Sequence, residues 1–227
     1  MINPDVFHFL NQLKANNNRR WFVQHKAEYA AARAAALETI DHVIAGMARF
    51  DPPIVEQDPE DCLFRINRDV RFSRDKSPYK AHFGAFITDR GRKVDRAGYY
   101  LHVEPGDSML AGGLYMPPAL PLRAVRQAIL RDGRPLRRIV SRPNFVKLFG
   151  DTLPGRRLKT APRDIPRDHP DLDLLQLTSF EVALPLKDAR LRKKDFVEYA
   201  VGVFEVMHDY IAWLNRALDS FAPDRSA

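Results

Sequence analysis

Apolar residues at helical spacing mark both ends of the chain. Asn3-Pro4-Asp5 is a typical helix start, with a capping residue, a proline in the first turn and an early acid. Apolar residues then recur every three or four positions over 6–13, and again over 196–218. Asn18 can cap a second helix over about 19–49, which Asp51-Pro52-Pro53 would end. The sequence therefore predicts N-terminal and C-terminal helices that each bury one face.

A period of two predicts strands in the middle of the chain. The predicted strands are residues 63–73, 81–88, 99–104, 108–116 and 179–186. Short connections with turn residues join the first four, so neighbours in sequence are expected to be neighbours in the sheet. We therefore predict an α+β fold: an antiparallel sheet of about five strands, with the N-terminal and C-terminal helices packed on one face.

The remaining segments complete this picture. Residues 121–139 and 144–149 are predicted to be helical, and Asp171 begins a short helix. Residues 153–170 form a connection rich in proline and arginine, to which the sequence assigns no role. The chain has no internal repeat and no evident linker, so we predict a single domain over 1–222 and a frayed tail over 223–227.

The most unusual stretch runs from Cys62 to Lys80. Between 65 and 80 it carries six Lys and Arg residues against only two Asp. On a strand over 63–73, apolar residues would share one face, interrupted by Arg68, and polar residues would share the other. The apolar residues are Phe64, Ile66, Val70 and Phe72, and the polar ones are Arg65, Asn67, Asp69, Arg71 and Ser73. Such a strand would make a good floor for a polar pocket.

The run RDVRFSRDKSPYK, from Arg68 to Lys80, resembles the signature of an uncharacterised bacterial family known only as a domain of unknown function. Other stretches resemble the same family: NNNRRWF at 16–22, GYYLHVEPG at 98–106, AGGLY at 111–115 and DHP at 168–170. Together they follow the expected order over about residues 7–218. The family has no established activity, so the resemblance implies the extent of the domain and not its function.

The residues themselves favour a site for an anion. Arginines on a rigid strand present planar forks that grip phosphate or carboxylate with two hydrogen bonds each. The predicted ligand-binding residues are Arg65, Arg68, Arg71, Ser73, Lys76 and Lys80. If the protein is an enzyme, the predicted proton-transfer residues are Asp69, Asp75, Tyr79 and His102. Our leading hypothesis is a basic cleft that binds a phosphorylated or carboxylated small molecule.

Two alternatives stay open. Residues 68–80 could form a structural ion-pair network that only pins a turn. Residues 123–167 hold thirteen Lys and Arg against three Asp, whereas the whole chain has a net charge of +7, so this surface could bind nucleic acid. The usual explanation of such an excess is solvated side chains on helix faces.

Several kinds of site are disfavoured. His82, His102 and Glu104 could meet on adjacent strands, but no His-Glu-x-x-His motif supports a metal and the sequence does not give the strand register. Ser73 and Lys76 have the spacing of a penicillin-binding enzyme without its companion motifs. The sequence has no phosphate-cradling loop, dinucleotide fingerprint or nucleophile elbow. We therefore expect no metal and no cofactor.

Composition limits the class of protein. The 227 residues are 45% hydrophobic and 29% charged, as in globular proteins, and no apolar run is long enough to span a bilayer. The N-terminus lacks the basic start and apolar centre of a signal peptide. One cysteine, Cys62, excludes an internal disulfide. We expect a cytoplasmic protein with no membrane partner. The substrate, the reaction and the oligomeric state stay open.

Overall fold

A four-stranded antiparallel sheet forms the centre of the protein. The structure is a computed structural model that describes residues 1–163 and 165–221. The strands follow one another in the sheet in chain order: β1 (Phe83–Ile87), β2 (Gly98–Val103), β3 (Ser108–Leu114) and β4 (Phe180–Leu186). The α+β class is confirmed, with four strands in place of about five.

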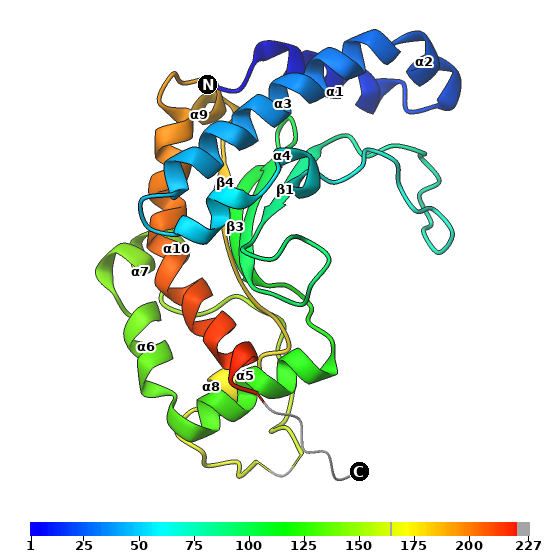
Figure 1. Cartoon of the computed structure of the whole chain (residues 1–227). Coiled ribbons are helices and arrows are strands. Elements are labelled where there is room, and N and C mark those ends of the chain that lie inside the picture. Colours follow the sequence, from blue (N-terminus) through cyan, green and yellow to red (C-terminus); the bar gives the residue numbers. More distant parts are fainter. Residues whose placement is uncertain (164, 222–227) are drawn as a thin grey trace.

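Helices cover one side of this sheet (Figure 1). The helices of the described residues are α1 (Pro4–Ala15), α2 (Arg19–Gln24), α3 (Lys26–Met47), α4 (Pro59–Cys62), α5 (Ala119–Asp132), α6 (Arg134–Val140), α7 (Pro143–Phe149), α8 (Leu172–Leu175), α9 (Asp188–Leu191) and α10 (Phe196–Asp219), with a short 3₁₀ helix, η1 (Pro52–Glu56). The long α10 packs directly on the sheet, where Met207 and Ile211 approach Gly112 of β3 so closely that a larger residue would not fit. The buried face of α10 carries the apolar spacing seen in the sequence.

Asparagine caps begin the first two helices as predicted. The Asn3 side chain accepts a hydrogen bond from the amide of Asp5 at 2.9 Å, and Asn18 accepts one from Trp21 at 2.9 Å. The prediction of one helix over 19–49 is wrong in detail. The structure has two helices there, α2 and α3, because the helix is interrupted at His25. There the ring Nδ1 lies 2.8 Å from the carbonyl oxygen of Trp21, which also accepts the His25 backbone amide. The predicted helical stretch over 121–139 consists of two helices, α5 and α6, which meet at Gly133, the residue that the sequence offers as an end of the first part.

The two faces of β2 have different surroundings. Tyr99, Leu101 and Val103 are buried on the side of α3 and α10; the Tyr99 ring, for example, lies 5.3 Å from that of Phe204 in α10. Tyr100 and His102 alternate with them and point to the opposite face. In the register of the sheet His102 pairs with Gly84 of β1 and with Met109 of β3. The first strand pair therefore presents polar groups on the face without α10.

The predicted strand over 63–73 is wrong. This stretch makes only isolated bridges, Leu63 with Ala85 and Asn67 with Tyr79, and otherwise forms a long loop that projects beside the sheet (Figure 1). Phe72, expected on an apolar face, is 96% exposed. Arg68 shares that face, and its guanidinium pairs with Asp75 at the cleft, where it avoids the cost of burial among apolar residues. The polar floor that we predicted is therefore a loop.

The base of this loop is nevertheless well fixed. The Asn17 side chain forms two hydrogen bonds with the backbone of Tyr79, donating to its carbonyl at 2.9 Å and accepting from its amide at 3.1 Å. The Tyr79 ring stacks on Phe22 with centroids 3.9 Å apart. The amide of Lys80 donates to the carbonyl of Ile66 at 2.8 Å, so the two arms of the loop are joined. These bonds hold residues 66–67 and 79–80 against the first helices.

Two further points concern the chain as a whole. Among the helices of residues 1–163 and 165–221, none combines the length and the apolar character needed to cross a membrane. The predicted frayed tail, 223–227, lies outside the described residues.

Candidate functional site

A cleft of about 550 Å³ lies where the base of the 63–82 loop meets the end of β2 and the end of α1. Its lining is strongly polar and mixes both signs of charge. It consists of Lys14, Asn17, Arg68, Asp69, Asp75, Ser77, Tyr79, Lys80, Ala81, His82 and Glu104. Five of the residues predicted from the sequence are among them: Arg68, Asp69, Asp75, Tyr79 and Lys80.

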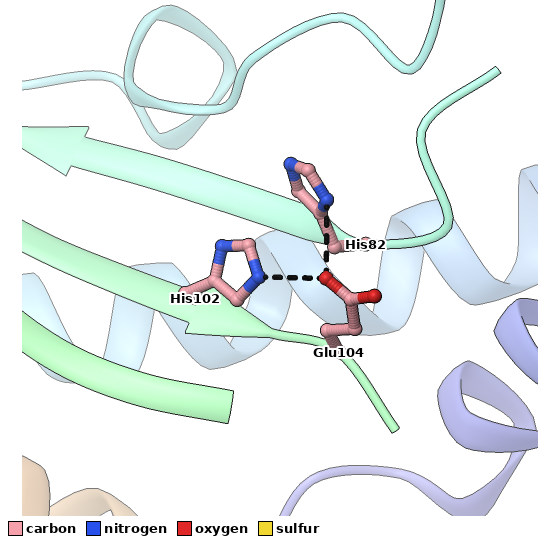
Figure 2. A group of neighbouring side chains, drawn as sticks. All are labelled: His82, His102 and Glu104. Atoms are coloured by element: carbon pink, nitrogen blue, oxygen red, sulfur yellow. Dashed lines mark hydrogen bonds and ion pairs between the residues drawn. The ribbon is translucent and has the colours of Figure 1, made fainter. Parts of the chain in front are cut away.

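Two histidines and a glutamate meet at one end of the cleft (Figure 2). The Nε2 atom of His102 lies 3.1 Å from Oε2 of Glu104, and Nδ1 of His82 lies 3.5 Å from the same oxygen. The two imidazole rings are 4.3 Å apart. His102 is only 7% exposed, whereas His82 and Glu104 are partly open to the cleft. The strand register that the sequence does not give thus brings the three side chains together.

Tyr100 fixes the orientation of His102. Its hydroxyl lies 2.9 Å from Nδ1 of His102, the ring nitrogen that faces away from Glu104. Gly84, on the neighbouring strand, makes room for this hydroxyl, since a Cβ atom at that position would overlap it. Tyr100, His102 and Glu104 therefore form a chain of hydrogen bonds along one face of β2.

Burial governs the protonation of this cluster. It lowers the pKa of His82 to about 4, and the nearby His102 lowers it further while Glu104 opposes the shift. Burial also raises the pKa of Tyr100 to about 12, with a smaller contribution from Glu104. At neutral pH the His82 ring is thus an uncharged base and the Tyr100 hydroxyl keeps its proton.

Lys80 is the most unusual cation of the cleft. Its pKa is lowered by burial first, and then by the positive charges of Arg65, Arg92 and Arg68. Its Nζ atom lies 5.4 Å from the centre of the Phe64 ring, and the Arg92 guanidinium lies 5.3 Å from the same ring. Within residues 1–163 and 165–221, no carboxylate lies within ion-pair distance of this ammonium. Lys80 is therefore half-buried among like charges.

The two aspartates of the loop are already engaged. Asp75 pairs with Arg68 and accepts hydrogen bonds from the amide and hydroxyl of Ser77, at 2.9 and 2.6 Å. These bonds, first those from Ser77 and then that from Arg68, lower the pKa of Asp75 to about 2. Asp69 pairs with Arg71 at 2.7 Å, and its pKa is lowered by the same partner. Both carboxylates are weak bases at neutral pH.

Other predicted residues lie away from the cleft. Arg71 and Ser73 are on the projecting part of the loop, and the Lys76 ammonium donates to the carbonyl of Val70 at 3.0 Å. Arg65 is not part of the lining, although its charge acts on Lys80. Tyr79 reaches the cleft, but its ring stacks on Phe22 and is 7% exposed. His102 is not itself in the lining of the cleft, but it contacts Glu104, which is.

Sequence reasoning missed the contribution of α1. Lys14 lines the cleft, and its Nζ lies 3.8 Å from Oε1 of Glu104. Asn17, which follows α1, also lines the cleft, and its side chain holds the backbone of Tyr79. The three consecutive asparagines offered a signal, since caps account for one or two of them and leave the third to be explained.

A family model matches residues 5–213 of the chain, a range that includes the whole cleft. It is described as a conserved hypothetical protein, DUF2461. The chain belongs to the DUF2461 family. The resemblance expected from residues 68–80 is thereby confirmed, and the description of DUF2461 assigns no activity. Comparisons with the curated proteins and with the solved structures found no match.

Proposed function

We propose that the cleft of this DUF2461 protein binds a phosphorylated or carboxylated small molecule. The observation that carries the proposal is Lys80, a half-buried ammonium over the Phe64 ring that, among the described residues, has no carboxylate partner and whose pKa is lowered by burial and by the charges of three arginines. Such an arrangement costs stability in the free protein. A bound anion removes that cost, because it supplies the missing negative charge.

The neighbouring groups support an anionic ligand. Arg68 and Lys14 line the cleft together with Lys80 and supply donors from two other parts of the chain. Arg68 holds Asp75 in the absence of ligand, and a phosphate or carboxylate competes for the same guanidinium. The volume of about 550 Å³ lies within the range of about 300–1,000 Å³ typical of small-molecule sites.

The structural alternative applies to a different part of the loop. Asp75, Ser77 and the Asn17 bonds to Tyr79 account for the shape of the loop without any ligand. They do not account for Lys80, which no described acid compensates. We therefore propose that the loop is pinned by one set of residues and binds its ligand through another.

The nucleic-acid alternative has less support. Five arginines of the 123–167 stretch are bonded within the chain, to carboxylates or backbone carbonyls. They are Arg126, Arg134, Arg137, Arg142 and Arg157. A guanidinium engaged in this way is less available to a phosphate backbone. An oligonucleotide belongs in the test for this reason.

The experiment is thermal melting of the full chain against nucleotides, sugar phosphates, carboxylates and a short oligonucleotide. We expect one class of small anion to stabilise the protein, by about 2.7 kcal/mol at a concentration of a hundred times its dissociation constant. Lys80→Met keeps the aliphatic stem over Phe64 and should abolish this stabilisation. Arg71→Ala is the matched control, because Arg71 lies outside the lining of the cleft and its ion pair, among the described residues, is with Asp69.

Three results would contradict the proposal. One is that no small anion raises the melting temperature. Another is that Lys80→Met and Arg71→Ala respond to the anion equally. The third is stabilisation by the oligonucleotide alone, with an affinity that falls steeply with salt, which would favour the nucleic-acid alternative.

The proposal also covers the domain organisation and the cellular location of the protein. A hydrophobic core that runs from Ile2 to Ala217 supports a single domain over 1–222. The one thiol, Cys62, is buried and its pKa is raised to about 11, chiefly by burial, as suits a reduced and unreactive cysteine. We propose a cytoplasmic protein on this basis.

A further inference from the structure

We propose that His82, His102 and Glu104 bind a divalent transition-metal ion at the end of the cleft (Figure 2). The three side chains come from the entrance of β1, from β2 and from the residue after β2. Each offers one ligand atom, and the three atoms lie within 4.8 Å of one another. Within the described part of the chain this is the group of such residues that meets the geometry of a metal site.

The spacing of these atoms is close to that of a real centre. Metal bonds of about 2.0–2.1 Å at tetrahedral angles place two ligand atoms about 3.4 Å apart. Oε2 of Glu104 is 3.1 Å from Nε2 of His102 and 3.5 Å from Nδ1 of His82. The two imidazole nitrogens lie within 4.8 Å of each other. The His82 side chain is partly exposed and has room to adjust, whereas His102 is buried.

The donor atoms select the class of metal. Two imidazole nitrogens and one carboxylate oxygen are the ligands of catalytic zinc sites and of non-haem ferrous sites. Mg²⁺ and Ca²⁺ prefer oxygen ligands throughout and fit this set poorly. Zinc and ferrous iron are therefore the ions that we expect.

Tyr100 completes the argument from outside the ligand set. Histidines that bind metals almost always donate their second ring N–H to a fixed acceptor, which sets the ring orientation. With a metal on Nε2 of His102, the Nδ1 hydrogen points at the Tyr100 oxygen, 2.9 Å away. This partner holds the His102 ring in the orientation that a metal on Nε2 requires.

Three protein ligands leave coordination positions open, and the cleft lies on the side of His82 and Glu104. An oxygen of the phosphate or carboxylate that we propose for the cleft can fill one of them. This extension rests on the proposed function, whereas metal binding itself does not. It also replaces the expectation of a metal-free protein, which was made without the strand register.

The test is a titration of the metal-free full chain with Co²⁺ and Zn²⁺ in a buffer without phosphate or carboxylate. Co²⁺ serves as the probe because its visible absorption reports the number and geometry of its ligands. We expect one ion per chain. Glu104→Gln, which keeps the shape of the side chain, should weaken binding by more than about 100-fold, and Tyr100→Phe by about 10- to 100-fold.

One control variant and one substitute ligand variant complete the experiment. His42→Ala removes an exposed histidine of α3 and should leave both affinity and stoichiometry unchanged. His82→Asn replaces a partly exposed ligand and serves if Glu104→Gln does not fold. Equal binding by the wild type and by both ligand variants would overturn the proposal, and so would the absence of a bound ion in the wild type.

A second titration separates the metal from the anion. The anion found by thermal melting is titrated against the metal-loaded chain and against the chain in excess chelator. Tighter binding to the loaded chain supports coordination of the anion. Equal affinity overturns that coordination and leaves the metal site standing. If the chain binds metal but no anion, the proposed function is overturned, and so is coordination of the anion by the metal. The metal site itself is not affected by that result.

Discussion

Two cations of this protein lie in opposite situations. Arg96, next to the start of β2, is 8% exposed and bonds two carboxylates, with Nη2 2.5 Å from Asp89 and Nη1 2.7 Å from Asp219. Lys80, in the lining of the cleft, is half-buried, and no carboxylate of the described residues forms an ion pair with it. Carboxylates of the protein neutralise the charge of Arg96, whereas no carboxylate of the described residues pairs with Lys80.

The surroundings of Arg96 extend this contrast. Tyr99 donates a hydrogen bond to Asp51 at 2.9 Å, and His208 lies 3.1 Å from the same hydroxyl. The Asn215 side chain forms two hydrogen bonds with the backbone of Ala97, at 2.9 and 3.1 Å. These groups connect β2 with the last turns of α10 and with the end of α3. A cluster whose charges are paired within the protein stabilises the fold, whereas a partly buried charge without a partner indicates a ligand site.

The largest effect on stability is expected from a substitution of Arg96. Arg96→Met leaves Asp89 and Asp219 without their partner, so we expect the free energy of unfolding to fall by about 3 kcal/mol. Urea denaturation measures it. Arg90→Met is the control, because Arg90 is well exposed and only borders the same carboxylates, and it should cost less than about 1 kcal/mol. Equal losses would show that the Arg96 network is not a unit.

Neighbouring tyrosines on β2 test the two faces of the sheet. Tyr99→Phe removes the donor to Asp51 from a fully buried position and should cost about 1–3 kcal/mol. Tyr100→Phe removes a hydroxyl on the cleft face and should cost about 1 kcal/mol or less. Denaturation curves of both variants, recorded without metal, give the comparison. A larger loss for Tyr100→Phe would make the cleft face the structural one.

Lys80→Met should behave unlike an ordinary core substitution. The change removes a charge that is repelled by three guanidinium groups and keeps the contact with Phe64, so stability should stay constant or rise by up to about 1 kcal/mol. The same variant should lose the anion. Urea denaturation with and without ligand measures both properties. A clear loss of stability in the free protein would show that Lys80 is a structural residue.

The smallest expected effect depends on pH. A hydrogen bond to Asp51 raises the pKa of His208 above its ordinary value, although burial opposes the shift. The protonated ring is therefore favoured in the folded state, and its contribution is complete below about pH 6.5 and disappears as the pH rises through the raised pKa. Unfolding free energies between pH 5.5 and 8.5 should show a small decline that is absent in His208→Gln. An increase over this range would contradict the assignment.

Much of the fold could be predicted from local pattern. The alternation over 98–114 and the turn at Pro105-Gly106 gave β2 and β3 nearly to the residue, and the apolar spacing of α10 gave its buried face. These signals depend on neighbours in sequence, and tertiary contacts do not change them. The missed elements η1, α4 and α9 are too short for a period to be recognised.

The site was harder to predict, because it depends on register and on a loop. His82 and Glu104 could be considered together, but only the pairing of β1 with β2 brings them to one place. Arg68 lines the cleft, yet from a loop and not from the predicted strand, and the lining mixes both signs of charge. Arg71, expected on the polar face of the predicted strand, lies outside the cleft, whereas Arg68, expected on the apolar face, lines it. Alternation alone cannot tell which arginines share a cavity.

Gly84 has a consequence for the evolution of this family. Because its missing Cβ is the space that the Tyr100 hydroxyl occupies, the two positions cannot change independently. In a homologue with a side chain at position 84, a tyrosine at position 100 must shift its hydroxyl or be replaced, and either change disturbs the contact with His102. The two columns of a family alignment are therefore expected to covary, and the histidine is expected to follow them.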